Sequence, residues 1–134
     1  MSIPPNKIEV KRLLDLARRQ LADGGVKGLT PDGSFEHSYS AALTVATLVV
    51  RASGERIHGT DHHRLTFERF GQLNGGRWAN VADYLQHARR RRNTAAYDFA
   101  GSVSVKEAAE LGDQTSGLLK DVEKWLAKDH SDLT

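Results

Sequence analysis

The sequence predicts an all-α fold, an up-down antiparallel bundle of four main helices plus one short helix. Four long segments repeat apolar residues at steps of three and four, the spacing that gathers side chains on one face of a helix. Short loops that contain glycine join these segments, as is typical of neighbouring antiparallel helices. Because no segment alternates apolar and polar residues as a half-buried strand would, we expect one helical core over about residues 7–128.

The first two helices are predicted over residues 7–23 and 35–56. Asn6 follows two prolines and can cap the first helix, which Gly24 and Gly25 end. The glycines and the proline between the two helices predict a loop there. The second helix is the most apolar of the chain, so we expect it to lie at the centre of the bundle.

The third and fourth helices are predicted over residues 61–73 and 78–99. An Asn-Gly-Gly sequence closes the short third helix, and Gly101 stops the fourth. Ser102 or Ser104 can cap the fifth helix, whose apolar stripe lasts to about Lys128. We expect the tail, residues 129–134, to be loose and flexible.

The composition limits the class of protein. The 134 residues, 39% of them hydrophobic, suffice for one modest core, so we expect a single domain over residues 1–134. The chain has no cysteine for a disulfide or a thiolate metal site, which fits a reducing cytoplasm. No stretch approaches the roughly 20 apolar residues of a membrane span, so we expect a cytoplasmic protein without a membrane partner. A formal net charge of +2 is too weak to indicate nucleic acid by itself.

The fourth helix places a cation among apolar residues. Its inward stripe is predicted to read Val81, Leu85, Ala88, Arg92, Ala95 and Phe99. A guanidinium keeps its charge at any ordinary pH, so an inward Arg92 must meet a carboxylate, several carbonyls or a cleft open to anions. One interpretation is a structural ion pair, with Glu36 or Asp83 as the partner. The other is a phosphate-binding arginine that lines a groove, and the periodicity leaves both open.

Arg92 ends a run of four arginines, Arg89, Arg90, Arg91 and Arg92. At about 100° per residue the run covers about 300° of the helix circumference, so only one or two of its side chains can face inward. Such a run is usually a solvated helix face. The alternative is a set of contacts to phosphates of an RNA or DNA backbone.

The stretch from Arg92 to Asp98, RNTAAYD, resembles the fourth-helix signature of HEPN (higher eukaryotes and prokaryotes nucleotide-binding) domains. In that signature an arginine, often followed by a polar residue such as Asn93, precedes a histidine. The basic start of the first helix, the alanine-rich second helix and the His62-His63 pair are similar to the family as well. The resemblance covers about residues 8–128. In active members it implies a metal-independent, dimeric endoribonuclease, whose histidine assists the RNA 2′-hydroxyl while the arginine stabilises charge on phosphorus.

This sequence departs from the family at the expected base, because Tyr97 stands where active members have histidine. A phenol with a pKa near 10 would need a shift of about 3 units, or about 4 kcal/mol, to accept a proton at neutral pH. The resemblance therefore favours a catalytically degenerate RNA- or nucleotide-binding domain, related to toxin–antitoxin or defence systems. It also implies a homodimer, and a cognate nucleotidyltransferase-type or antitoxin protein as a further partner.

Two other functions remain open. The first is an active endoribonuclease that uses Arg92 and Asn93 with Tyr97 or with a histidine from another segment. The second is a non-catalytic protein-interaction bundle whose arginines are solvated. Three more residues are candidates for the site: Asp98, which can pair with an arginine, His63 and His87. We expect neither a metal nor a cofactor, because adjacent histidines point about 100° apart on a helix and no carboxylate-histidine repeat occurs.

Overall fold

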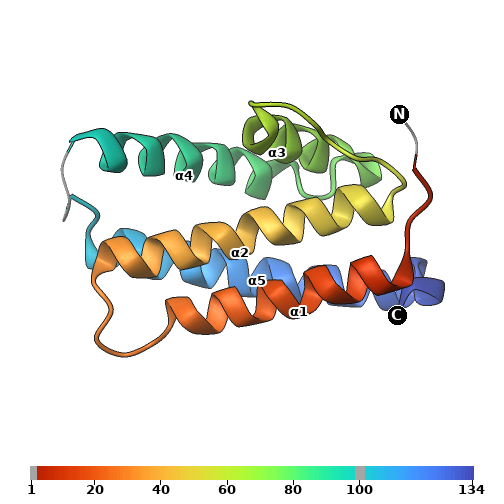
Figure 1. The fold of residues 1–134 in the computed structure, drawn as a ribbon, viewed down its shortest axis with the longest axis horizontal. Coiled ribbons are helices and arrows are strands. Elements are labelled where there is room, and N and C mark those ends of the chain that lie inside the picture. The colour runs from red at the N-terminus through yellow and green to blue at the C-terminus, as the bar shows by residue number, and fades with distance from the viewer. Residues whose placement is uncertain (1–2, 99–101) are drawn as a thin grey trace.

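The computed structural model describes residues 3–98 and 102–134, and within the first range it describes side chains as far as residue 94. These residues form five α-helices: α1 (Lys7–Gly24), α2 (Pro31–Ala52), α3 (His62–Gln72), α4 (Ala79–Asp98) and α5 (Val105–Asp129). Two single 3-10 turns, η1 (Asn74–Gly76) and η2 (Ser131–Leu133), follow α3 and α5. No strand occurs in either described range. The predicted all-α bundle, with four main helices and a short third one, is confirmed (Figure 1).

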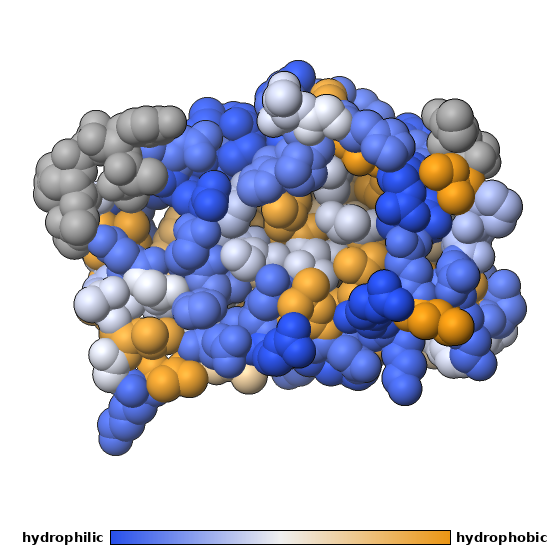
Figure 2. Space-filling view, in the orientation of Figure 1, coloured by the Kyte–Doolittle hydropathy of each residue, from blue (hydrophilic) through white to orange (hydrophobic). Residues whose placement is uncertain are grey.

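Helix α2 lies at the centre of the bundle, as its apolar sequence predicted. It packs against α1, α5 and α3, whereas α4 packs mainly against α3 (Figure 1). The fully buried large side chains come from all five helices: Val10, Tyr39, Val45, Leu48, Val49, Val50, Phe67, Phe70, Leu85, Leu111, Trp125 and Leu126. Figure 2 shows that one face of the molecule is mostly hydrophilic, with separate apolar groups and no continuous apolar patch. None of the helices described is both long and apolar enough to cross a membrane.

The predicted caps of α1 and α5 are confirmed. The Asn6 side chain accepts hydrogen bonds from the backbone N–H groups of Ile8 and Glu9, at 2.8 and 3.2 Å. Ser104 and Glu107 form a reciprocal capping box at the start of α5, in which each side chain binds the backbone of the other residue. These side chains satisfy N–H groups that the first turn of a helix leaves without partners.

Helix α2 begins and ends earlier than predicted. It starts at Pro31, because proline suits the first position of a helix and the Thr30 hydroxyl accepts a hydrogen bond from Gly33 N–H. The predicted start at residue 35 treated this proline and glycine as loop residues. The helix ends at Ala52, since Gly54 adopts a φ of 87° that turns the chain toward α3.

The tail also differs from the expectation of a loose segment. Residues Ser131–Leu133 form a 3-10 turn, and Leu133 is only 5% exposed because it packs into the core cluster. Leu133 therefore packs the end of the chain against the bundle. Because Leu133 is a single apolar residue among polar ones, helical periodicity could not predict that it is buried.

Helices α3 and α4 approach closely at Gly71. A Cβ atom at this position would lie 2.7 Å from the Ala82 Cβ, so only glycine fits without displacement. Beyond η1, Trp78 stacks on Phe70 with ring centroids 5.5 Å apart, and its indole N–H donates to Asp121 at 2.8 Å. This packing fixes how α3 presents its first turn to the residues of α2 and α4.

Candidate functional site

The four arginines of α4 have different partners. Arg91 donates to Glu107 of α5 at 2.7 Å, and Arg92 donates to Glu36 of α2 at 2.8 Å. Arg89 and Arg90 instead contact neighbours on their own helix that are not carboxylates, Gln86 at 2.9 Å and His87 Nδ1 at 3.1 Å. The run is therefore neither a uniform solvated face nor a uniform set of structural ion pairs.

Arg92 lies at the edge of the core. Its Nε and Nη2 groups both donate to the Glu36 carboxylate, and its guanidinium carbon lies 5.0 Å from the centre of the Tyr39 ring. The ion-pair interpretation is thus confirmed, with Glu36 as the partner. Arg92 is nevertheless 34% exposed, whereas Leu85 of the same stripe is fully buried. The reason is visible in Figure 1, where the half of α4 that carries the arginines extends beyond α3.

Tyr39 brings α2, α3 and α4 together beneath Arg92. Its ring is 1% exposed, and its hydroxyl lies 3.0 Å from Nδ1 of His63, the second residue of α3. Arg89 lies three residues before Arg92, so the two side chains share one face of α4. We call the five residues Glu36, Tyr39, His63, Arg89 and Arg92 the α2–α3–α4 cluster.

The electrostatics of the cluster keep both of its rings neutral at pH 7. Burial raises the pKa of Tyr39 to about 12, although the charges of Arg92 and Arg89 act in the opposite direction. Burial also lowers the pKa of His63, and the charges of His62, Arg92 and Arg89 lower it further. A neutral phenol buried in this way needs an acceptor for its proton. His63 Nδ1 is the one acceptor within reach among the described residues, and a hydroxyl that donates to it requires the imidazole proton on Nε2.

Several N–H donors of the cluster have no partner within the part of the chain that the structure describes. Only Nε of Arg89 is engaged, so both of its Nη groups lack a hydrogen-bond partner among the described residues. The Nη1 group of Arg92 is unengaged in the same sense, because Glu36 contacts only Nε and Nη2. Within the cluster a single carboxylate faces two guanidinium groups, which leaves one positive charge uncompensated.

Arg91 has a structural role instead. It binds both carboxylate oxygens of Glu107 and the carbonyl of Ser102, and so joins α4 to the first turn of α5. The hydrogen bonds from Arg91, followed by those from Ser104, lower the pKa of Glu107 to about 2. These contacts place Arg91 outside the candidate site, although the sequence grouped it with its neighbours.

The other predicted site residues are not brought into the cluster. Asn93 is exposed, and His87 is exposed on the side of α4 where it contacts Arg90. The side chains of Tyr97 and Asp98 lie outside the described residues, so their predicted roles stay predictions. Among the side chains described, no three of the types that bind metals are grouped to hold an ion.

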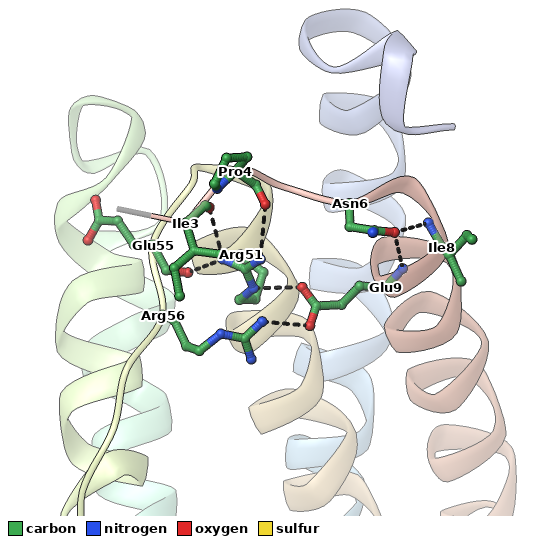
Figure 3. A network of polar contacts seen from close by, with 8 residues as sticks. All are labelled: Ile3, Pro4, Asn6, Ile8, Glu9, Arg51, Glu55 and Arg56. Carbon is green, nitrogen blue, oxygen red and sulfur yellow. Dashed lines mark hydrogen bonds and ion pairs between the residues drawn. The ribbon is translucent and has the colours of Figure 1, made fainter. Parts of the chain in front are cut away.

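The sequence reasoning missed the arginine that is truly buried. Arg51 is 3% exposed and donates to Glu9 at 2.6 Å and to the carbonyls of Ile3, Pro4 and Glu55 (Figure 3). A signal for it existed, since Arg51 is the only charged residue in the last two thirds of the most apolar helix. A charge among the apolar residues of a central helix needs polar partners if it is buried.

No family model, no curated protein and no solved structure matches this chain. The resemblance to HEPN domains therefore stays a prediction. The cluster offers two guanidinium groups, one held by a carboxylate, and an imidazole whose orientation is set by a buried phenol. Such a set of donors suits an anion with several oxygen atoms.

Proposed function

We propose that the α2–α3–α4 cluster binds phosphate groups of RNA or of a nucleotide, without efficient cleavage. The observation that carries this proposal is the excess of cationic donors. Arg89 and Arg92 share one face of α4, and among the described residues Glu36 is the only carboxylate that pairs with either of them. Like charges at this spacing destabilise a helix, so an anionic ligand would relieve a cost that the protein alone does not offset. Guanidinium groups match phosphate geometry and can donate two parallel hydrogen bonds.

The geometry favours binding over cleavage. A general base must accept a proton near neutral pH, and Tyr39, with its pKa raised to about 12, cannot do so. In the tautomer argued above, His63 presents an N–H group and acts as a donor to an anion. Its neutral state also suits a site that already contains two cations, because a third charge would increase the repulsion.

The resemblance adds a biological setting to this proposal. HEPN-like domains imply a homodimer, and an α4 face shared between two copies would double the number of phosphate contacts. A cytoplasmic domain of a toxin–antitoxin or defence system, with a nucleotidyltransferase-type or antitoxin partner, is the setting we propose. These properties depend on the family assignment, whereas phosphate binding depends only on the cluster.

The test is binding of fluorescently labelled single-stranded RNA, followed by anisotropy at several salt concentrations. We expect Arg89→Gln to weaken binding about tenfold and to lower the salt slope by about 1, the change expected for one lost phosphate contact. Arg90→Gln is the matched control, because Arg90 is the next residue along α4 but lies outside the cluster. Equal loss in both variants would show a diffuse basic surface and contradict the proposal.

The same samples, analysed on denaturing gels, test the alternatives. Intact RNA is expected throughout. Cleavage that Arg92→Ala abolishes would instead support the endoribonuclease alternative, and absence of both binding and cleavage would support the protein-interaction alternative.

A further inference from the structure

A small pocket lies at the other end of α2, between that helix, the following loop and the start of α3. Its volume is about 80 Å³. Its polar lining comes mainly from Arg51, Arg56, His62 and Thr66, and Val50 and Ile57 add apolar walls. No residue of this pocket belongs to the α2–α3–α4 cluster, so the site can be argued independently of the proposed function.

Arg51 gives this pocket a fixed positive charge. Its Nε donates to Glu9, Nη1 to the carbonyls of Ile3 and Glu55, and Nη2 to the carbonyl of Pro4, as Figure 3 shows. These bonds hold the guanidinium in one position without removing its charge. Arg56 extends from the loop to the other oxygen of the same carboxylate, at 2.9 Å.

The charge balance around the pocket is positive. Glu9 is the single carboxylate shared by Arg51 and Arg56. Burial raises the pKa of Glu9, but hydrogen bonds from the two arginines outweigh that effect and hold its pKa below the usual value, so it is ionised at neutral pH. The carboxylates nearest in sequence are engaged elsewhere, Glu55 with Arg69 at 2.7 Å and Asp61 with Arg64 at 2.6 Å.

Three residues at the pocket have donors without an acceptor among the described residues. Thr66 is 3% exposed, and its hydroxyl makes no hydrogen bond to any described residue. Thr47, which also lines the pocket, differs because its hydroxyl donates to the Leu43 carbonyl at 2.8 Å. Arg56 uses only Nη2, and the His62 ring has no hydrogen bond among the described residues. Thr66 lines the pocket, so its unpartnered hydroxyl is available to donate to a bound acceptor.

The backbone at the start of α3 also favours an anion in this pocket. His62 is the first residue of α3, and no side chain caps the N-terminus of this helix. The first N–H groups of an uncapped helix carry partial positive charge and favour an anion. The pocket thus combines a helix N-terminus with two arginines, a histidine and the unpartnered hydroxyl of Thr66, a residue that is 3% exposed.

We infer that this pocket binds one tetrahedral oxyanion, as inorganic phosphate or as a phosphate group of a nucleotide or nucleic acid. A cavity needs about 10 to 15 Å³ on the same measure to hold one water molecule, so a pocket of about 80 Å³ has room for a small polyatomic anion. The anion oxygens would accept from Thr66, Arg56 and His62, while Arg51 supplies charge from beneath. Val50 and Ile57 form the apolar walls of the pocket.

Titration of the ¹⁵N-labelled protein with inorganic phosphate tests this inference. We expect saturable shifts of the amide signals of His62 and Thr66, and about tenfold weaker binding in both Thr66→Val and Arg56→Gln. Thr47→Val is the matched control, since that hydroxyl is already engaged, and Arg89→Gln controls for binding at the α2–α3–α4 cluster. Both controls are expected to bind phosphate as the unmodified chain does. Absence of saturable shifts, or equal weakening in Thr47→Val, would overturn the inference.

Short RNA with and without a 5′-phosphate distinguishes the sources of the anion. If the 5′-phosphorylated RNA displaces inorganic phosphate and the unphosphorylated RNA does not, the ligand is a terminal phosphate. If inorganic phosphate saturates the pocket and neither RNA displaces it, the ligand is free phosphate. If Arg89→Gln abolishes RNA binding but leaves the phosphate shifts intact, the two sites are independent, and failure of one proposal leaves the other standing.

Discussion

Two arginine–glutamate pairs lie at opposite ends of α2, and they differ in how fully the guanidinium is used. Arg51, 3% exposed, donates from all three of its nitrogen atoms to Glu9 and to backbone carbonyls. Arg92, 34% exposed, donates only to Glu36, and its Nη1 has no partner among the described residues. Every nitrogen atom of the Arg51 side chain has an acceptor, so this arginine stabilises the fold. Arg92 has an unengaged nitrogen that can donate to a ligand.

The largest effect on stability is expected from a variant that breaks the Arg51–Glu9 pair. Glu9→Gln would leave Arg51 buried without its counter-ion, and breaking a buried pair usually costs about 3 to 5 kcal/mol. Because the carbonyls of Ile3, Pro4 and Glu55 still accept from Arg51, we expect the lower end, about 3 kcal/mol. Urea denaturation followed by circular dichroism measures this loss.

The matched variant at the other end of α2 is Glu36→Gln. Its carboxylate is 49% exposed, so the pair with Arg92 should contribute less than about 1 kcal/mol. Equal losses in Glu9→Gln and Glu36→Gln would contradict the distinction between a structural and an available arginine. We also expect Glu36→Gln to strengthen RNA binding, because it adds one net positive charge to the cluster.

An effect between those of Glu9→Gln and Glu36→Gln is expected at Gly71, which positions α3 against α4. Gly71→Ala would place a Cβ atom 2.7 Å from that of Ala82, and such overpacking costs about 1 to 3 kcal/mol. Since α3 carries His63 to one site and His62 to the other, displacement of this helix should weaken both anion sites. Gly117→Ala is the control, because no atom lies within 4 Å of a Cβ there, and it should stabilise the chain slightly. Equal stability of the two variants would contradict this role of Gly71.

The sequence predicted the helices well where local chemistry decides their ends. Asn6 and Ser104 cap helices in the structure because their side chains bind N–H groups two or three residues away. The start of α2 was wrong because Pro31 and Gly33 read equally well as a loop or as a first helical turn. The hydrogen bond from Gly33 N–H to the Thr30 side chain makes this segment a first helical turn, and the pattern of apolar residues contains no information about that cap.

The candidate site was predicted less completely, since burial of a cation depends on which helices cover it. The periodic stripe of α4 correctly placed Arg92 beside core residues, but it could not show that α3 ends short of this position. Arg51 escaped notice because its partners, Glu9 and the residues before α1, are far away in sequence. His63 was a candidate, yet only the tertiary structure shows that Tyr39 orients its ring.

The smallest expected effect concerns the pKa of His63 in the α2–α3–α4 cluster. Burial lowers this pKa, and the charges of His62, Arg92 and Arg89 add to the effect, so Arg89→Gln should raise it. Because the folded protein favours the neutral ring, the free energy of unfolding should decrease as pH falls below 6.5, the ordinary pKa of histidine, and decrease less in the variant. NMR titration of the imidazole signals measures the pKa, with Arg90→Gln as the control.

The ¹⁵N shifts from that titration also identify which ring nitrogen carries the proton. If the buried Tyr39 hydroxyl donates to Nδ1, the proton lies on Nε2, and His63 can donate to an anion but cannot accept a proton. If Nδ1 is protonated instead, Nε2 is an acceptor next to Arg89 and Arg92, and the phenol must find another partner. That tautomer would shift the cluster from phosphate binding toward proton transfer, in favour of the endoribonuclease alternative. An equal pKa change in Arg90→Gln would show that the arginines act as a diffuse charge and that the cluster is not a defined site.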